Sequence, residues 1–247
     1  MALDITGRRT RDLPLIRTSV PSRALPAPDA AREAGEAAVP DGDWRRGLPV
    51  LHGEGLTLRE LQLSDAPHLL PLLNETEVSR FLAPPPRTGA GLRRFVRWAH
   101  RQRAEGRYAC FAIVPRGTNS SAGFFQLRAL DTEVATAEWG FVLGRPYWGT
   151  GLFAEGAALA QAFAFGCMGV RRLEARALAA NGRAQGALLK VGAVREGVLR
   201  QAFAINGQRC DTTLWSILDT DWRARLRARG EGRVRVDGPL SAATYLQ

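Results

Sequence analysis

The fold of this chain is decided by residues 137–156, which read AEWGFVLGRPYWGTGLFAEG. Successive side chains in the first part of this stretch are expected to point to opposite faces, as they do in a strand. Trp139, Phe141 and Leu143 lie on one face, and Glu138, Gly140 and Val142 lie on the other. The ring of Pro146 fixes φ and biases Arg145 away from the helical region, so the predicted strand ends there.

After Gly149 and Gly151 the spacing of the apolar residues becomes helical. One face of the predicted helix carries Leu152, Gly156, Leu159, Ala160, Phe163 and Cys167. The first N–H groups of a helix have no intrahelical partner, and the helix dipole places partial positive charge at the same point. Glycine also lets a phosphate group approach the backbone closely. The stretch therefore predicts a phosphate-binding turn, unless the glycines serve only tight packing of strand and helix.

Two common phosphate-binding motifs can be compared with this turn. A P-loop requires a lysine directly after its last glycine. The only lysine of the chain is Lys190, so a P-loop is excluded. The dinucleotide-binding fingerprint is matched formally by Gly149, Gly151 and Ala154. That fold needs the motif early in a doubly wound domain, and too little chain follows here to build both halves. A dinucleotide-binding oxidoreductase stays an alternative that rests on this match alone.

The composition predicts one ordinary domain with extensions and no membrane span. The chain has 247 residues, of which 45% are apolar, and a net charge of +10. It contains no apolar run of about 18 residues, and its N-terminus lacks the apolar segment of a signal peptide. Cys110, Cys167 and Cys210 are odd in number and widely spaced, which favours free buried thiols in a reducing compartment. We therefore expect a cytoplasmic protein.

The histidines and the basic residues predict neither a metal site nor a nucleic-acid site. His52, His68 and His100 are scattered, and they form neither a metal-ligand pair nor a hydrolase triad. Every basic residue except Lys190 is an arginine, which indicates a coding bias as much as a binding requirement. A basic surface suits an anionic ligand, but no basic patch with interleaved aromatic residues accompanies it. We expect no metal and no specific binding of nucleic acid.

The chain is expected to have three segments. Residues 1–53 are rich in Pro, Ala and Arg and show no periodicity, which predicts a disordered extension. Residues 54–222 form the folded domain, whose first strand is predicted at Leu56, and residues 223–247 form a basic C-terminal tail. The predicted elements of the domain are a strand, two helices, three strands, a helix, a strand, a helix and two strands.

Further short motifs occur in a fixed order around the glycine turn. They are Glu138, Trp148-Gly149-Thr150-Gly151, Asn181-Gly182-Arg183-Ala184, Lys190-Val191-Gly192-Ala193, Glu196-Gly197-Val198-Leu199-Arg200 and Asn206-Gly207. With the order of elements, they resemble the GNAT superfamily of acyl-CoA-dependent N-acyltransferases, whose motif A is Q/R-x-x-G-x-G/A. Among its branches the resemblance favours the ribosomal-protein N-terminal (alanine) acetyltransferases. The resemblance spans about Leu56 to Trp222 and implies an α/β (α+β) fold with a mixed, mostly antiparallel sheet flanked by helices.

The resemblance also implies that acetyl-CoA is the co-substrate. In that family the N–H groups of the loop hold the pyrophosphate of coenzyme A, and the preceding strand pairs with the pantetheine arm. The cofactor-binding residues implied for this sequence are Val142, Leu143, Trp148, Gly149, Thr150, Gly151, Leu152, Phe153 and Asn181. The second substrate is expected to be a primary amine, either a peptide N-terminus or a small molecule. A monomer or a homodimer is expected.

Glu138 is the predicted catalytic base. An amine must be neutral to attack a thioester, and Glu138 is expected to accept its proton directly or through water, if its face of the strand opens to the cleft. The alternative is a structural carboxylate paired with an arginine. A backbone N–H of the central strand is expected to stabilise the thioester oxygen. Asn181 is expected to be a helix cap, a ligand of the pantetheine arm, or both.

Some positions depart from the family pattern. They are Pro146, Ala184, Ala193 and Phe203. Ala184 stands where that branch has a serine, whose hydroxyl lies near the departing thiol. Tyr147 and Ser216 are therefore candidates to protonate the thiolate, and Glu196 is either a second acid/base group or an ion-pair partner of Arg200. Because of these departures, a non-catalytic acyl-CoA-binding regulatory protein stays an alternative function.

Overall fold

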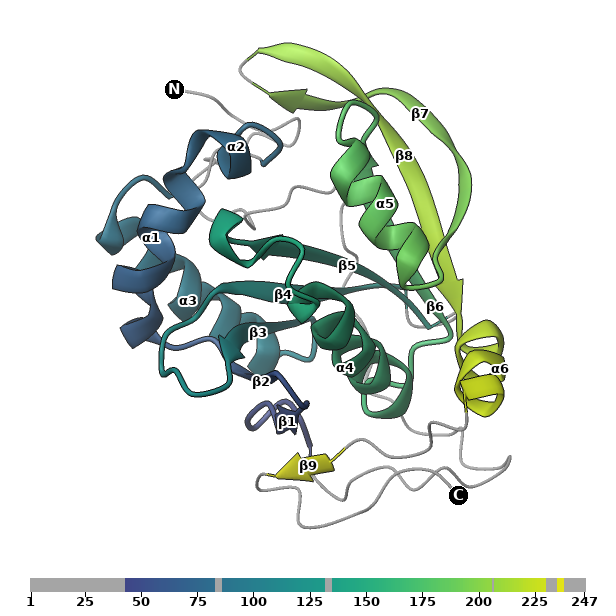
Figure 1. Ribbon diagram of the computed structural model, residues 1–247, viewed down its shortest axis with the longest axis horizontal. Coiled ribbons are helices and arrows are strands. Elements are labelled where there is room, and N and C mark those ends of the chain that lie inside the picture. The colour runs from purple at the N-terminus through teal and green to yellow at the C-terminus, as the bar shows by residue number, and fades with distance from the viewer. Residues whose placement is uncertain (1–42, 83–85, 132–134, 206, 230–234, 238–247) are drawn as a thin grey trace.

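The computed structural model, which describes residues 43–82, 86–131, 135–205, 207–229 and 235–237, contains one nine-stranded sheet (Figure 1). Its strand order is β7-β8-β6-β5-β4-β3-β2-β1-β9. The strands are β1 Val50–His52, β2 Leu56–Glu60, β3 Tyr108–Pro115, β4 Gly123–Asp131, β5 Thr136–Leu143, β6 Arg172–Leu178, β7 Val194–Ile205, β8 Gln208–Leu218 and β9 Arg235–Asp237. All neighbours pair antiparallel except β5 and β6. The expected fold class is confirmed, and the doubly wound sheet of a dinucleotide-binding domain is wrong.

Helices cover both faces of the sheet. They are α1 Ala66–Asn74, α2 Thr76–Ser79, α3 Gly89–Ala104, α4 Leu152–Gly166, α5 Gly182–Lys190 and α6 Asp219–Arg229. One core, which includes Leu69, Leu92 and Phe95, joins α1 and α3 to one face. A second core, which includes Phe163 and Leu188, joins α4 and α5 to the other face, which is toward the viewer in Figure 1. None of the helices in the described ranges is long and apolar enough to cross a bilayer.

The central strand β5 shows the alternation that its sequence predicts. Trp139 and Leu143 belong to the core on the α4 and α5 side of the sheet, whereas Val142 belongs to the core on the α1 and α3 side. The strand ends at Leu143, and a 3-10 turn over Arg145–Tyr147 leads to the glycines. Helix α4 begins at Leu152, as predicted. The quoted stretch therefore lies at the middle of the sheet, between its two cores.

The two parallel strands β5 and β6 separate soon after they meet. Their ladder has three residue pairs and ends where Glu138 lies opposite Glu174. Beyond this point, residues 139–143 and 175–178 are not paired with one another, although β5 continues to pair with β4 and β6 with β8. Backbone N–H and C=O groups need partners. The separation therefore opens a gap whose two edges can accept the backbone-like groups of a ligand.

The folded domain begins before the predicted boundary at residue 54. Trp44, Leu48 and Leu51 are buried, and β1 pairs with β2. The Trp44 ring lies edge-on to Phe163 of α4, with 6.0 Å between the ring centroids. The sequence gives no sign of these contacts, because this short segment contributes isolated anchors to the core rather than a periodic pattern. Residues 1–42 lie outside the described residues.

The secondary structure also continues beyond the predicted boundary at residue 222. Helix α6 continues to Arg229, and within it Arg225 donates a 2.6 Å hydrogen bond to the carbonyl oxygen of Gly192. Strand β9 then pairs with β1 at the edge of the sheet. Strands β7 and β8 form the predicted closing antiparallel pair, in which Gly207 has φ of +80°. Asn206 of that turn lies outside the described residues, as do residues 230–234 and 238–247.

Candidate functional site

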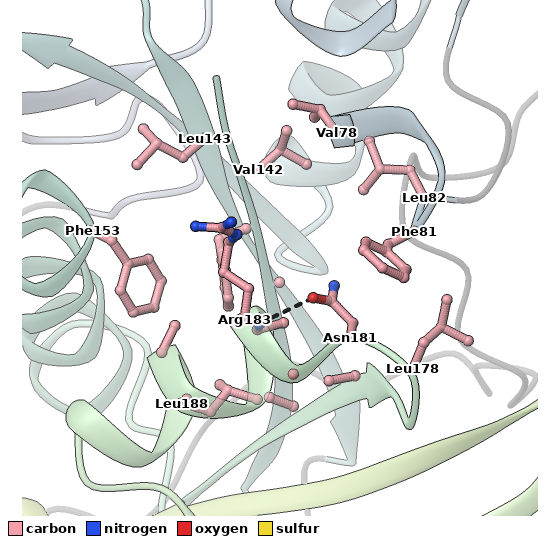
Figure 2. A pocket seen from close by; sticks show the side chains of 18 of the residues that line it. Val78, Phe81, Leu82, Val142, Leu143, Phe153, Leu178, Asn181, Arg183 and Leu188 are labelled. Carbon is pink, nitrogen blue, oxygen red and sulfur yellow. Dashed lines mark hydrogen bonds between the residues drawn. The ribbon is translucent and has the colours of Figure 1, made fainter. Parts of the chain in front are cut away.

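A cavity of about 800 Å³ lies in the gap between β5 and β6. Its walls come from the glycine turn, the first turn of α4, the ends of β5 and β6, and α5. Residues after α2 and the β7–β8 pair complete it. In Figure 2 Phe153 of α4 and Phe81, which follows α2, face each other across the cavity. Segments that are far apart in sequence therefore meet at the place where the sheet opens.

The glycine turn has the backbone conformation that a phosphate site needs. Gly149 has φ of +78° and Gly151 has φ of +90°, a region that L-residues rarely adopt. A Cβ atom at either position would meet nothing within 4 Å, so the turn faces open space. Both glycines line the cavity, as do Phe153 and Ala154 of the first turn of α4. The N–H groups at this helix start are available to an anion.

The indole of Trp148 fixes the end of β5. Its Nε1 donates a 2.8 Å hydrogen bond to the carbonyl oxygen of Leu143. The guanidinium of Arg183 lies over the same indole, with 4.1 Å between Cζ and the ring centroid. Figure 2 shows the Arg183 side chain inside the cavity. A cation is therefore present between the helix start of α4 and the helix start of α5, where a phosphate group would benefit from it.

Asn181 caps helix α5 at the wall of the cavity. Its Oδ1 accepts a 3.1 Å hydrogen bond from the backbone N–H of Ala184, drawn as the dashed line in Figure 2. The cap role is thus present in the structure. Because the carboxamide oxygen serves the cap, its amide nitrogen is the group left to meet a ligand.

The structure brings most of the predicted cofactor residues to one cavity. Those that line it are Val142, Leu143, Trp148, Gly149, Gly151, Phe153 and Asn181. Two do not. Thr150 is exposed, and its hydroxyl donates a 2.8 Å hydrogen bond to the carbonyl oxygen of Tyr147. Leu152 packs against the core beneath α4. Their side chains shape the turn, and a direct role in binding stays a prediction for their backbone groups.

Glu138 lies outside the cavity wall. Its side chain is 5% exposed, and its Oε2 lies 3.1 Å from Nη2 of Arg128, its neighbour on β4. Burial lowers the pKa of Arg128, and the charge of Glu138 opposes that shift. The geometry thus matches the structural alternative, a carboxylate paired with an arginine. A base at Glu138 has to act through water or after a movement of Arg128.

Glu196 and Ser216 form a separate polar cluster on the same face of the sheet. Two hydrogen bonds of 2.8 and 2.5 Å from Arg172, and one of 2.6 Å from the Ser216 hydroxyl, reach the Glu196 carboxylate. The bonds from Arg172, and then the bond from Ser216, lower the pKa of Glu196 to about 2. Glu196 is therefore ionised at neutral pH, and its partner is Arg172 rather than Arg200. Of the candidate acids, Tyr147 is the one that lines the cavity.

Several cavity residues gave no signal in the sequence. Val78, Phe81 and Leu82 follow or belong to a helix of one turn, which has too little length to show periodicity. Arg176 and Thr212 lie inside strands, where a single polar residue is usually assigned to the solvent face. These cavity residues can be identified only once it is known that β5 and β6 separate.

The remaining reactive side chains of the described residues do not form a second centre. The three cysteines are free thiols, and burial raises the pKa of Cys110 and raises that of Cys167 to about 12. No group of three or more His, Cys, Asp and Glu side chains in the described ranges is arranged to hold a metal ion. The cavity at the sheet opening is therefore the candidate functional site.

Residues 55–194 match the sequence family described as the acetyltransferase (GNAT) domain. The chain belongs to the GNAT acetyltransferase family. It is 27% identical over 176 residues to an uncharacterized N-acetyltransferase of Bacillus licheniformis, p20, and the match covers 71% of this chain and 99% of that protein. A solved T. thermophilus structure that carries the acetyltransferase assignment is 31% identical, with a TM-score of 0.62 and coverage of 73% of this chain and 96% of that one.

The solved RimJ of Mycobacterium smegmatis, in complex with CoA-disulfide, has a TM-score of 0.64 and an identity of 18%. The match covers 74% of this chain and 93% of that one, and at this identity it shows the fold alone. The residues matched to the family include strands β2 to β6, the glycine turn, α5 and most of the residues that line the cavity. The outer elements β1, α6 and β9 lie outside the residues matched to the family.

Proposed function

We propose that this GNAT protein transfers an acetyl group from acetyl-CoA to a primary amine, on a peptide N-terminus or a small molecule, by direct attack. The observation that carries the proposal is that the positive-φ glycine turn and the separated edges of β5 and β6 open onto the same cavity. A glycine turn alone suits many phosphates. A turn joined to an open strand edge suits a ligand with a phosphate end and an amide-containing arm.

In this proposal the backbone holds most of acetyl-CoA. The N–H groups at the start of α4 bind the pyrophosphate, because the turn is open and the helix dipole favours anions there. Arg183 and Lys190 of α5 supply positive charge on the cavity wall. The edge of β5 over residues 139–143 binds the amides of the pantetheine arm, which brings the thioester to the gap between the strands.

The reaction needs little from side chains once both substrates are held. The lone pair of a neutral amine attacks the thioester carbonyl carbon, an N–C bond forms, and the C–S bond breaks as the thiolate leaves. One proton passes overall from nitrogen to sulfur. Holding two reactants together supplies a large part of the acceleration in such reactions. A backbone N–H of β5 is our candidate to stabilise the developing oxyanion.

In this proposal two side chains assist the transfer of the proton from the amine nitrogen to the thiolate sulfur. Glu138 is our candidate base through water, because its carboxylate is buried beside Arg128 rather than on the wall. Tyr147 is our candidate acid, because Ala184 has no hydroxyl and Ser216 donates to Glu196. A thiol of pKa about 8.5 also leaves as a thiolate at modest cost near neutral pH.

The alternative function is an acyl-CoA-binding protein without turnover. Two observations favour it: Ala184 in place of the branch serine, and the pairing of Glu138 with Arg128. Both functions need the same cavity to bind acetyl-CoA. They differ only in whether the acetyl group is then transferred to an amine.

The test incubates the full chain with acetyl-CoA and a panel of primary amines. Free thiol is detected continuously, and the product is identified by its mass. Turnover above the rate of thioester hydrolysis is the expected result, and Gly149→Val is the control that should remove it. Calorimetric titration should show binding of acetyl-CoA but not of NAD. Binding of acetyl-CoA without amine-dependent thiol release would establish the binding protein instead.

A further inference from the structure

The cavity passes from one face of the sheet to the other. Ala175 and Leu188 on its wall belong to the core on the α4 and α5 side. Because strand residues alternate, Arg176 and Leu178 of β6 point to the opposite face. We call the region on that face the acceptor half. The acceptor half is lined by Val78, Phe81, Leu82, Arg176, Phe203 and Thr212.

Arg176 brings unused hydrogen-bonding capacity to the acceptor half. Its side chain is 18% exposed, and its Nε and Nη1 make no hydrogen bond with the described residues. Its Nη2 lies 4.0 Å from Oε2 of Glu174, but the other oxygen of that carboxylate is already bonded to Nε of Arg172 at 2.9 Å. A guanidinium is always charged and carries five N–H donors. A carboxylate in the cavity would be a good partner for it.

Thr212 adds a second donor close to Arg176. It is 4% exposed, and its hydroxyl makes no hydrogen bond with the described residues. On β8 it lies opposite Leu178, so it is the diagonal neighbour of Arg176 on the same face. Such neighbours in an antiparallel pair are about 7–8 Å apart, a distance that one bound carboxylate can bridge with the long arginine side chain. Burying a polar group without a partner is costly, so both groups favour a ligand that satisfies them.

The charges of the cavity point the same way. Among the described residues that line the cavity, Glu77 is the only acidic one. Its carboxylate is paired with Nε of Arg145 at 2.9 Å. Arg80 and Arg176 also line the cavity, and the described wall carries no free carboxylate to pair with them. A polycationic amine would meet like charge there, whereas an anionic group would be attracted.

We propose that the acceptor is a small α-amino acid with an apolar side chain, bound through its carboxylate. The inference deepens the proposed amine transfer and rests on it. The carboxylate accepts hydrogen bonds from Arg176 and Thr212. The apolar side chain contacts Phe81, Leu82 and Phe203, which form an apolar wall (Figure 2 shows the first two). This arrangement leaves the α-amine directed toward the gap between β5 and β6, where the thioester is expected.

The test compares acceptors that differ only in the carboxylate. L-leucine, L-methionine and L-phenylalanine are assayed beside their amides, and the dipeptides that begin with each residue serve as models of a peptide N-terminus. Hydrogen bonds to a charged group typically change selectivity about ten- to hundred-fold. We expect kcat/KM for the free amino acids to exceed that for the amides by at least about ten-fold.

Variants separate a specific contact from general charge. Arg176→Gln should remove the preference for the free acid while the amide reaction and the acetyl-CoA affinity change little, and Thr212→Val should reduce it partly. Arg80→Gln is the matched control, because it removes an exposed charge of the same cavity. An equal loss in Arg80→Gln would overturn the assigned contact. Thr212→Val decides the question if Arg176→Gln does not fold.

The outcome is separable from that of the proposed function. Amides or dipeptides acetylated as fast as free amino acids would leave amine transfer intact and overturn the inference. If no amine is turned over, the amino acid is not an acceptor, and calorimetry of the CoA-saturated protein tests the carboxylate contact alone: binding of amino acids but not of amides supports the contacts with Arg176 and Thr212. No binding of either overturns them.

Discussion

The two halves of the cavity present different chemical groups, the backbone in one half and side chains in the other. The turn half, which is Gly149, Gly151 and the first turn of α4, presents backbone groups from one continuous segment. The acceptor half presents side chains from three separate places, the residues after α2, strand β6 and the β7–β8 pair. A backbone surface recognises a chemical feature that every donor molecule shares. A side-chain surface can differ between proteins of one fold, and in our proposal this surface selects the acceptor.

The elements that support the two halves also differ. Helix α4 is held by the segment before β2, where Trp44 contacts Phe163 and the backbone N–H of Gly55 donates a 2.8 Å hydrogen bond to Glu155. The sheet face beside the acceptor half carries several ion pairs, among them Arg128 with Glu138 and Arg172 with Glu196. Apolar packing and one hydrogen bond thus support the turn half, whereas charged pairs lie beside the acceptor half.

The largest effect is expected at Glu138, which tests whether the sheet face beside the acceptor half contains a base. Glu138→Gln should lower kcat roughly 10²–10⁴-fold with little change in acetyl-CoA affinity. The loss should shrink as pH rises toward the pKa of the amine, because the neutral amine then no longer needs a base. Steady-state kinetics at roughly one-unit steps over about pH 6–10 measures both.

Arg128→Gln is the control for this prediction, since it breaks the same ion pair but keeps the carboxylate. Removing one partner of a buried pair is destabilising by several kcal/mol, so melting temperatures must be recorded for both variants. If Glu138→Gln keeps the wild-type rate and pH profile, Glu138 is structural and proximity carries the reaction.

Trp44→Ala tests the apolar support of the turn half. Loss of a large buried aromatic side chain costs about 3–5 kcal/mol, and Trp44 is 8% exposed and packed on α4. Urea unfolding should show this loss, and a chain that starts at residue 54 should show a loss at least as large. A chain that starts at residue 43 is the matched control and should keep the stability of the full chain. Equal stability of all three would return the boundary to residue 54.

Gly151→Val tests the backbone surface of the turn half directly. Valine is strained at φ of +90°, although its Cβ meets no atom within 4 Å, so the turn must change its path. Acetyl-CoA affinity should fall at least about ten-fold. Gly117→Val is the control, because that glycine also has positive φ and open space but lies outside the cavity. Calorimetry that finds equal affinity in both variants would show that the pyrophosphate is held elsewhere.

This contrast also explains what the sequence could predict. Residues 137–156 encode a strand, a turn and a helix locally, so the fold and the turn half follow from alternation, proline and glycine. Trp44 and Leu51 are isolated apolar residues in a segment without periodicity, so the sequence of that segment resembles a disordered one. Arg176 and Thr212 become neighbours only through the register of β6 with β8, and a register between distant strands has no local sequence signal.

The assignment of Glu138 shows the same limit from the other side. Glu138 lies on β5, and the alternation of Trp139 and Val142 between the two cores places it on the face opposite Trp139. Its partner was not predicted, because Arg128 belongs to another strand. The sequence alone therefore cannot assign a role, such as that of a base, that depends on which side chains surround a residue.

The smallest effect is expected at Glu196, beside the acceptor half, and it appears only at acid pH. Arg172 and then Ser216 lower the pKa of this carboxylate from 4.5 to about 2. A carboxylate whose pKa is lower in the folded state stabilises that state above the unfolded pKa, and the contribution is lost as pH falls through the folded pKa. The free energy of unfolding should therefore drop less steeply between about pH 4.5 and pH 2 in Glu196→Gln than in the wild type. The difference should be small, since the Glu196 side chain is 36% exposed and solvent screens the pair.

Urea unfolding at several pH values and two salt concentrations measures this difference, with the exposed Glu54→Gln as control. A Glu196→Gln slope equal to that of the wild type would show that the contacts of Glu196 with Arg172 and Ser216 add no stability.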